Sequence, residues 1–143
     1  MTLDEIHEEW DTDSVIDSIH LDKESLAIPK LHNKYLKIYS KEKMILAKKK
    51  SEYASLKLEK FNFLFTGVTE KKHHDWELPP QGKIIKSEIP FWLEGDKDLI
   101  ELGLKISLQQ EKCDVLYSII NSINNRQFNI SNATKFRIWE SGN

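Results

Sequence analysis

The chain has 143 residues, with 21 Lys or Arg and 23 Asp or Glu, and its formal net charge at pH 7 is -2. One cysteine excludes an internal disulfide and a cysteine-based zinc site, and it fits a protein of a reducing cytoplasm. With no long apolar run, no basic leader and no glycine-rich loop, the sequence predicts neither a membrane span, nor a signal peptide, nor a phosphate-cradling turn.

Charge is strongly segregated along the chain. Residues 1–29 hold nine acidic residues and one lysine, whereas residues 30–60 hold ten lysines and three glutamates. The remaining residues are nearly neutral. A basic segment of this density attracts a polyanion, and the acidic segment can contact a basic protein or shield the lysines. A solvated lysine-rich helix face without a ligand is the alternative.

The N-terminal half predicts two helices. Thr2 and Glu5 have the spacing of a capping box, which predicts a short helix ending near Asp11. Pro29 is tolerated in the first turn of a helix, so we expect the second helix to begin near Ile28. It continues without Gly or Pro to about residue 65 and carries an apolar stripe at helical spacing. The stripe comprises Leu31, Tyr35, Ile38, Ile45, Leu56 and Phe63.

The C-terminal half predicts a connector and a second long helix. Residues 67–95 contain Pro79, Pro80 and Gly82, with a short helical turn at 87–93. The helix that follows spans about 96–124, and after a break at 127–129 a final short helix begins near Ser131. Its main stripe comprises Leu99, Leu102, Ile106, Gln109, Cys113, Leu116, Ile120 and Ile123. A second stripe comprises Ile100, Leu104, Leu108, Val115 and Ile119.

Two apolar stripes on one helix indicate a helix enclosed on two sides, which in a chain of this length favours self-association. We therefore predict an all-α, homo-oligomeric protein with one domain. Its four segments are an acidic arm (1–29), a basic helix (30–66) that is the candidate for binding a polyanion, a connector (67–95) and an oligomerisation region (96–143). The predicted oligomerisation residues are Leu99, Leu102, Ile106, Leu116, Ile120 and Ile123.

Catalytic chemistry has little support in the sequence. The cluster His73-His74-Asp75 lacks a second ligand pair at metal spacing, and adjacent histidines point to different faces of a regular element. Cys113 occupies a core position and lacks an activating base. We therefore predict no enzyme activity, no metal and no cofactor.

Nucleic-acid binding has better support. Lysines neutralise phosphates and aromatic rings stack on unpaired bases, and both types gather near the end of the basic segment. The candidates are Lys48, Lys49, Lys50, Lys57, Lys60, Phe61 and Phe63, and Phe65 lies two residues beyond Phe63. The basic segment has no arginine, which disfavours specific readout of duplex DNA. Core packing is the alternative for each phenylalanine. A second basic set, Arg126, Lys135 and Arg137, could instead compensate a helix C-terminus.

Several extended segments carry a family resemblance. Residues 3–7, 13–17 and 24–37, together with 94–99, 122–133 and the ending at 140–142, resemble the UvsY proteins of T-even-like phages. The family has two basic residues one apart, followed by aromatics and a Gly. Here Lys60 matches the second basic position, Leu58 stands at the first, and Lys57 is displaced by one. Phe63-Leu64-Phe65 replaces the usual tyrosines.

The resemblance implies a non-enzymatic recombination mediator in the cytoplasm of the infected host. Such proteins form rings, here of six or seven subunits, and bind single-stranded DNA. They help a RecA-like phage recombinase to displace the phage single-strand-binding protein. Two alternatives remain: a helical scaffold oligomer without a nucleic-acid role, and a small nuclease, which the lack of a carboxylate or histidine constellation disfavours.

Overall fold

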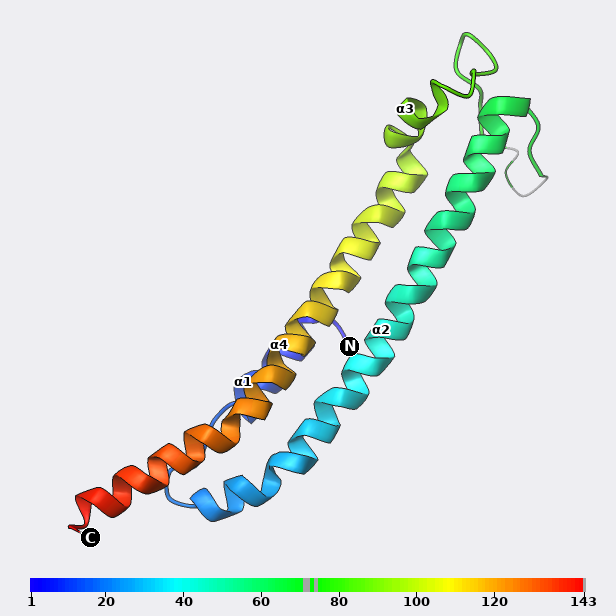
Figure 1. Cartoon of the computed structure of the whole chain (residues 1–143). Helices are drawn as coiled ribbons and strands as arrows, with labels where there is room; N and C mark the ends of the chain where they lie inside the picture. Colours follow the sequence, from blue (N-terminus) through cyan, green and yellow to red (C-terminus); the bar gives the residue numbers. More distant parts are fainter. Residues whose placement is uncertain (71–72, 74, 143) are drawn as a thin grey trace. The chain divides into compact units, whose positions relative to one another are not determined.

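The computed structural model describes residues 1–70, 73 and 75–142. These residues form four helices and no strand: α1 (Leu3–Asp13), α2 (Leu21–Thr66), α3 (Ile89–Glu94) and α4 (Lys97–Glu140) (Figure 1). The prediction of an all-α chain with two long helices and a mostly irregular connector is confirmed. No helix in the described part is long and apolar enough to cross a membrane.

Helix α2 begins at Leu21, earlier than the predicted start near Ile28. Pro29 therefore lies inside the helix and not in its first turn. A proline lacks the N–H that would reach the carbonyl four residues back, which here belongs to Ser25. Both Ser25 and Pro29 are exposed, so water can satisfy that carbonyl. Asp22 and Glu24 in the first turn also favour the positive end of the helix dipole.

Helix α4 has no break at 127–129, so the predicted separate final helix is wrong. Phe128 and Asn129 are weak helix formers, but helix propensity yields readily to packing. Arg126 and Ile130 are 5% exposed, and these two buried side chains, four residues apart, hold the stretch in one helix.

The chain divides into two compact units. The first comprises residues 1–44 and 109–143, and the second comprises residues 45–108. Each unit has its own core. The four functional segments proposed from the sequence remain a prediction.

The core of the first unit joins α1, the first half of α2 and the second half of α4 (Figure 1). The capping box at Thr2 forms as predicted, and it directs Ile6 of α1 into the core. The Trp10 ring meets the Tyr35 ring edge to face, with centroids 5.5 Å apart. The buried core residues are Ile6, Tyr35, Leu116, Ile119, Ile120 and Ile123.

A buried polar contact lies beside this core. Gln109 and Glu42 are 3% and 2% exposed, and the Gln109 side-chain amide donates to both the backbone carbonyl and the carboxylate of Glu42. The Met1 amino group lies 3.4 Å from the same carboxylate. The one polar residue of the main α4 stripe is thus matched by a polar partner on α2.

The second unit packs the connector and α3 between the end of α2 and the start of α4. Gly67 ends α2 with a φ of 74°, and its N–H donates to the Phe63 carbonyl. The connector then returns to α2, where the Ile84 N–H donates to the Leu64 carbonyl at 2.9 Å. The buried core residues are Ile84, Ile89, Leu93 and Leu99. Residues 83–86 of the connector form no strand.

Candidate nucleic-acid interface

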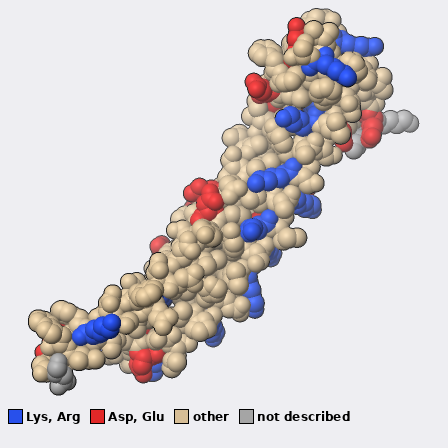
Figure 2. All heavy atoms as spheres, in the orientation of Figure 1, with Lys and Arg blue, Asp and Glu red and all other residues tan. Residues whose placement is uncertain are grey.

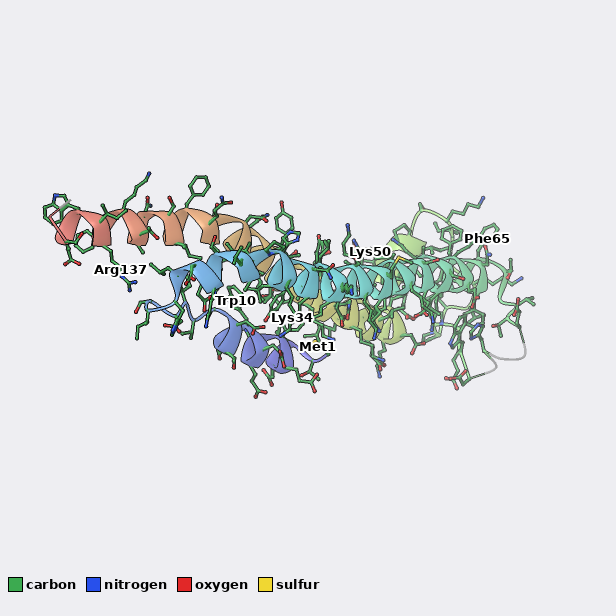
Figure 3. All side chains as sticks on the ribbon, turned by 90° about the horizontal axis from the view of Figure 1, so that it is seen from below. Met1, Trp10, Lys34, Lys50, Phe65 and Arg137 are labelled. Atoms are coloured by element: carbon green, nitrogen blue, oxygen red, sulfur yellow. The ribbon has the colours of Figure 1, made fainter. Side chains whose placement is uncertain are left out.

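Three of the predicted DNA-binding lysines are exposed on α2 in the second unit. Lys48, Lys50 and Lys57 are exposed and Lys49 is half-buried; Figure 3 marks Lys50. Among the side chains that the structure describes, none of these four forms an ion pair or a hydrogen bond. Their charges are therefore available to a phosphate backbone.

Lys60 has a different environment, although the sequence grouped it with these lysines. It is 7% exposed, and its ammonium lies 2.6 Å from Asp98 Oδ2 and 3.2 Å from Asp96 Oδ1. The same nitrogen lies over the Trp76 ring, 3.9 Å from the centroid. Because it is buried and paired, Lys60 ties α2 to the connector and to the start of α4, and we leave it out of the proposed interface.

The phenylalanines also separate. Phe63 is 7% exposed and packs against Trp76, with ring centroids 5.7 Å apart. Phe61 is half-buried against the second core. Phe65, in the last turn of α2, is 43% exposed (Figure 3). Of the three rings, Phe65 is thus the most open to a base.

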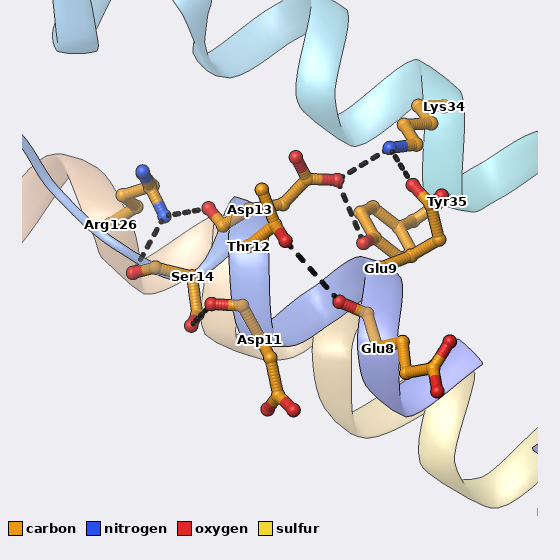
Figure 4. Close-up of polar contacts among 9 residues, drawn as sticks. All are labelled: Glu8, Glu9, Asp11, Thr12, Asp13, Ser14, Lys34, Tyr35 and Arg126. Atoms are coloured by element: carbon orange, nitrogen blue, oxygen red, sulfur yellow. Dashed lines mark hydrogen bonds and ion pairs between the residues drawn. The ribbon is translucent and has the colours of Figure 1, made fainter. Parts of the chain in front are cut away.

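The second basic set divides in the same way. Arg126 is buried in the first unit, where its guanidinium donates to the backbone carbonyls of Asp13 and Ser14 at 3.1 and 3.4 Å (Figure 4). It also donates to the Val15 carbonyl and the Glu24 carboxylate at 3.0 and 3.1 Å. It therefore satisfies carbonyls at and just after the end of α1 and is paired with Glu24 of α2, so it is not free for DNA.

Lys135 and Arg137 are exposed on the last turns of α4. Figure 3 shows Arg137 near the end of this helix. Both remain candidates for a second anion contact, with compensation of the helix C-terminus as the alternative.

One lysine of the basic segment is paired with the acidic arm. Lys34 lies 2.7 Å from Glu9 and 2.5 Å from Asp13, whose carboxylate also accepts from the Tyr35 hydroxyl at 2.9 Å (Figure 4). Burial alone would raise the pKa of Asp13. The hydrogen bonds from Lys34 and Tyr35 and the charges of Lys34 and Arg126 outweigh burial, so this pKa lies below its usual range. The contact shows α1 shielding one lysine, as charge segregation suggested.

Four of the six predicted oligomerisation residues lie in the chain's own cores. Leu99, Leu116, Ile120 and Ile123 are buried, and Leu102 and Ile106 are half-buried. Other large apolar residues of α4 are exposed instead. They are Ile100, Leu104, Leu108, Tyr117, Phe128, Phe136, Ile138 and Trp139.

The described residues offer neither a metal-ligand cluster nor an activated cysteine. None of their His, Cys, Asp and Glu side chains form a group of three or more that could hold a metal ion. His73 stacks on Trp76 with centroids 4.0 Å apart and pairs with Glu59, whereas His74 lies outside the described residues. Burial, reinforced by Glu42 and Asp114, raises the pKa of the Cys113 thiol, so a reactive thiolate is disfavoured.

Positive charge is spread out on the face drawn in Figure 2. The Lys and Arg residues there lie at intervals among acidic and uncharged residues and do not merge into one patch. Spaced cations suit a ligand whose charges are also spaced, as the phosphates of an extended nucleic-acid strand are.

An all-helical chain with exposed, unpaired lysines on a long helix has the features of a protein that binds an extended polyanion. A family profile described as "Recombination, repair and ssDNA binding protein UvsY" matches residues 9–143. The chain belongs to this family.

Solved structures agree in fold. Crystal structures of the bacteriophage T4 recombination mediator protein UvsY are similar to this chain in three lattice types. Lattice type II has a TM-score of 0.81 at 23% identity and covers 99% of this chain and 98% of that one. Lattice type IV has a TM-score of 0.78 at 20% identity and covers 98% of this chain and 99% of that one. Lattice type I has a TM-score of 0.79 at 22% identity and covers 95% of this chain and 98% of that one. No curated protein matches the chain significantly.

Proposed function

We propose that this protein is a recombination mediator that binds single-stranded DNA and helps a RecA-like recombinase to assemble on DNA covered by single-strand-binding protein. The family match over residues 9–143 carries the proposal. The exposed lysines of α2 supply the charge that such binding needs. The protein would act without catalysis, in the cytoplasm of the infected host.

The lysines favour a single strand held without sequence preference. Each ammonium acts as a point charge on a flexible stem, and the basic segment lacks the arginine fork that reads guanine edges. Binding of this kind neutralises phosphates and releases counterions, so its affinity falls steeply with salt. The proposed primary contacts are Lys48, Lys49, Lys50 and Lys57.

We further propose that subunits associate through exposed apolar residues near the end of α4. Phe136, Ile138 and Trp139 are 58%, 52% and 72% exposed, which is costly for a chain that stays monomeric. A hollow of about 660 Å³ lies nearby in the same unit, lined in part by Ile19, Leu21 and Ile130. Assembly into a ring of six or seven copies would multiply a weak lysine site by avidity.

The acidic residues of α1 are available to a protein partner. Asp4, Glu8 and Asp11 are exposed. Either the recombinase or the single-strand-binding protein could bind this surface if its own contact surface is basic.

The test is recombinase loading on a labelled oligonucleotide already covered by single-strand-binding protein. Addition of this protein should shorten the lag before the recombinase hydrolyses ATP. With a Lys48→Ala/Lys50→Ala/Lys57→Ala variant, the lag should stay nearly as long as it is without the protein. An unchanged lag with the wild-type protein would contradict the mediator role. If the protein also fails to bind the bare oligonucleotide, the scaffold alternative replaces the mediator role. Metal-dependent cleavage of the DNA would instead indicate a nuclease.

A further inference from the structure

The connector places a lysine over the most open ring of the phenylalanine cluster. Lys86 Nζ lies 5.0 Å from the centroid of Phe65, and both side chains are exposed. Phe65 belongs to the last turn of α2, whereas Lys86 comes 21 residues later along the chain. Two elements therefore meet to form this pair.

Backbone contacts fix the pair in place. The Ile84 N–H donates to the Leu64 carbonyl, and the Ile84 side chain is 3% exposed in the second core. This anchor lies one residue before Phe65 on α2 and two residues before Lys86 on the connector. The exposed Phe65–Lys86 pair is thus held in place by the buried Ile84 and its backbone hydrogen bond, all within the second unit.

A second lysine borders the same end of α2. A Cβ added at Gly67 would lie 3.2 Å from Lys83 Cε, so the stem of Lys83 crosses the backbone at the turn. Lys83 is also exposed. No basic residue of α2 itself lies in its last turn, so the positive charge at this end comes from the connector.

We propose that Phe65 and Lys86 form a binding site for one nucleotide of single-stranded DNA, in which the base stacks on the Phe65 ring and Lys86 binds the neighbouring phosphate. A nucleotide carries an aromatic base and an anionic phosphate a short covalent distance apart, and this pair presents a ring and a cation at similar separation. The inference rests on the proposed function and adds the connector to the DNA-binding surface of α2.

The test compares an oligo(dT) strand with an abasic strand of the same length, which keeps the phosphates and lacks the bases. Binding of each to the full chain is measured by fluorescence anisotropy at several salt concentrations. Phe65→Ala should weaken binding of oligo(dT) by about 5- to 150-fold and leave the abasic strand unaffected. Lys86→Ala should weaken both strands and reduce the salt slope by about 0.7.

Matched controls lie in the same unit. Phe91 on α3 is 75% exposed and Lys105 on α4 is exposed, so Phe91→Ala and Lys105→Ala should bind both strands like wild type. Circular dichroism checks that each variant keeps its helices, which separates a binding effect from loss of charge compensation at the end of α2.

The outcomes distinguish this site from the function on which it rests. If wild type binds oligo(dT) but Phe65→Ala and Lys86→Ala behave like their controls, the site is wrong and the proposed function stands. If Phe65→Ala lowers the affinity for oligo(dT) and for the abasic strand equally, the stacking role of Phe65 is wrong. If wild type binds neither strand, the proposed function fails and this site fails with it.

Discussion

The side-chain amide of Gln109 lies 2.6 Å from the carboxylate of Glu42, 67 residues earlier in the chain, and both side chains are almost fully buried. The same amide also donates to the Glu42 backbone carbonyl at 2.9 Å. Two helices that share an apolar interface are therefore also joined by a polar contact that only one register satisfies. A buried polar group that loses its partner destabilises the fold more than the contact itself stabilises it.

We expect Gln109→Leu to lower the free energy of unfolding by about 1–3 kcal/mol, because the Glu42 carboxylate then loses a donor. Urea unfolding at fixed protein concentration measures the change. The double variant Glu42→Leu/Gln109→Leu should recover part of the loss, since no buried charge is left without a donor. Gln127 is exposed on α4, so Gln127→Leu is the control. A Gln109→Leu variant as stable as that control would show that the contact contributes nothing.

Lys60 and Lys57 should separate stability from DNA binding. Lys60→Met removes the cation between Asp96 and Asp98, so we expect a loss of about 1–3 kcal/mol in the free energy of unfolding, while the salt slope of DNA binding stays at the wild-type value. Lys57→Met should do the reverse, with unchanged stability and a salt slope smaller by about 0.7. If both variants reduce the salt slope equally, Lys60 contacts DNA and its assignment as a purely structural residue is wrong.

The Asp13 contact should make the first unit sensitive to acid. A carboxyl whose pKa is lowered by folding contributes stability above its usual pKa, about 3.9, and that contribution is lost as the pH falls through the folded value. Asp13→Asn should therefore cost about 1–2 kcal/mol at pH 7, where wild-type Asp13 is ionised and bonded to Lys34 and Tyr35. The difference from wild type should shrink below about pH 4.

Thermal unfolding between pH 3 and pH 8 checks this pH dependence. Asp11 is exposed on the same helix, so Asp11→Asn should match wild type across the range. A stability difference for Asp13→Asn that stays constant with pH would contradict the assigned role of the carboxylate.

Assembly should depend on the end of α4. Phe136→Asp/Trp139→Asp is expected to reduce the sedimentation coefficient to that of a smaller species while the helix content is retained, because both residues are exposed in the single chain. Leu116→Asp should instead unfold the first unit, since Leu116 is 0% exposed. An unchanged sedimentation coefficient for the Phe136/Trp139 variant would place the interface elsewhere.

Much of the fold could be predicted from local patterns. The capping box at Thr2 and the turn at Gly67 mark helix ends through short-range chemistry, and the α4 stripe marks a buried face. The start of α2 and the continuity of α4 could not be predicted in this way, because they depend on whether water reaches the Ser25 carbonyl and on the burial of Arg126.

The candidate site could be predicted only in part from the sequence, because lysines near one another in sequence have different environments in the fold. Lys57 and Lys60 lie one helical turn apart, but Lys60 meets two aspartates more than 35 residues later and a tryptophan of the connector. The sequence indicated Lys86 only weakly. This lysine ends the short segment Lys83-Ile84-Ile85-Lys86, in which Ile84 is buried and both lysines are exposed. Such pairings between distant segments need the three-dimensional fold.

The central claim is that the exposed lysines of α2 bind the phosphates of single-stranded DNA. It is tested most directly by the salt dependence of oligo(dT) binding for wild type and for Lys48→Ala/Lys50→Ala/Lys57→Ala. We predict that the logarithm of the association constant falls linearly with the logarithm of salt concentration, and that the triple variant reduces this slope by about 2. A triple variant that keeps its helices and shows the wild-type affinity and slope would contradict the claim.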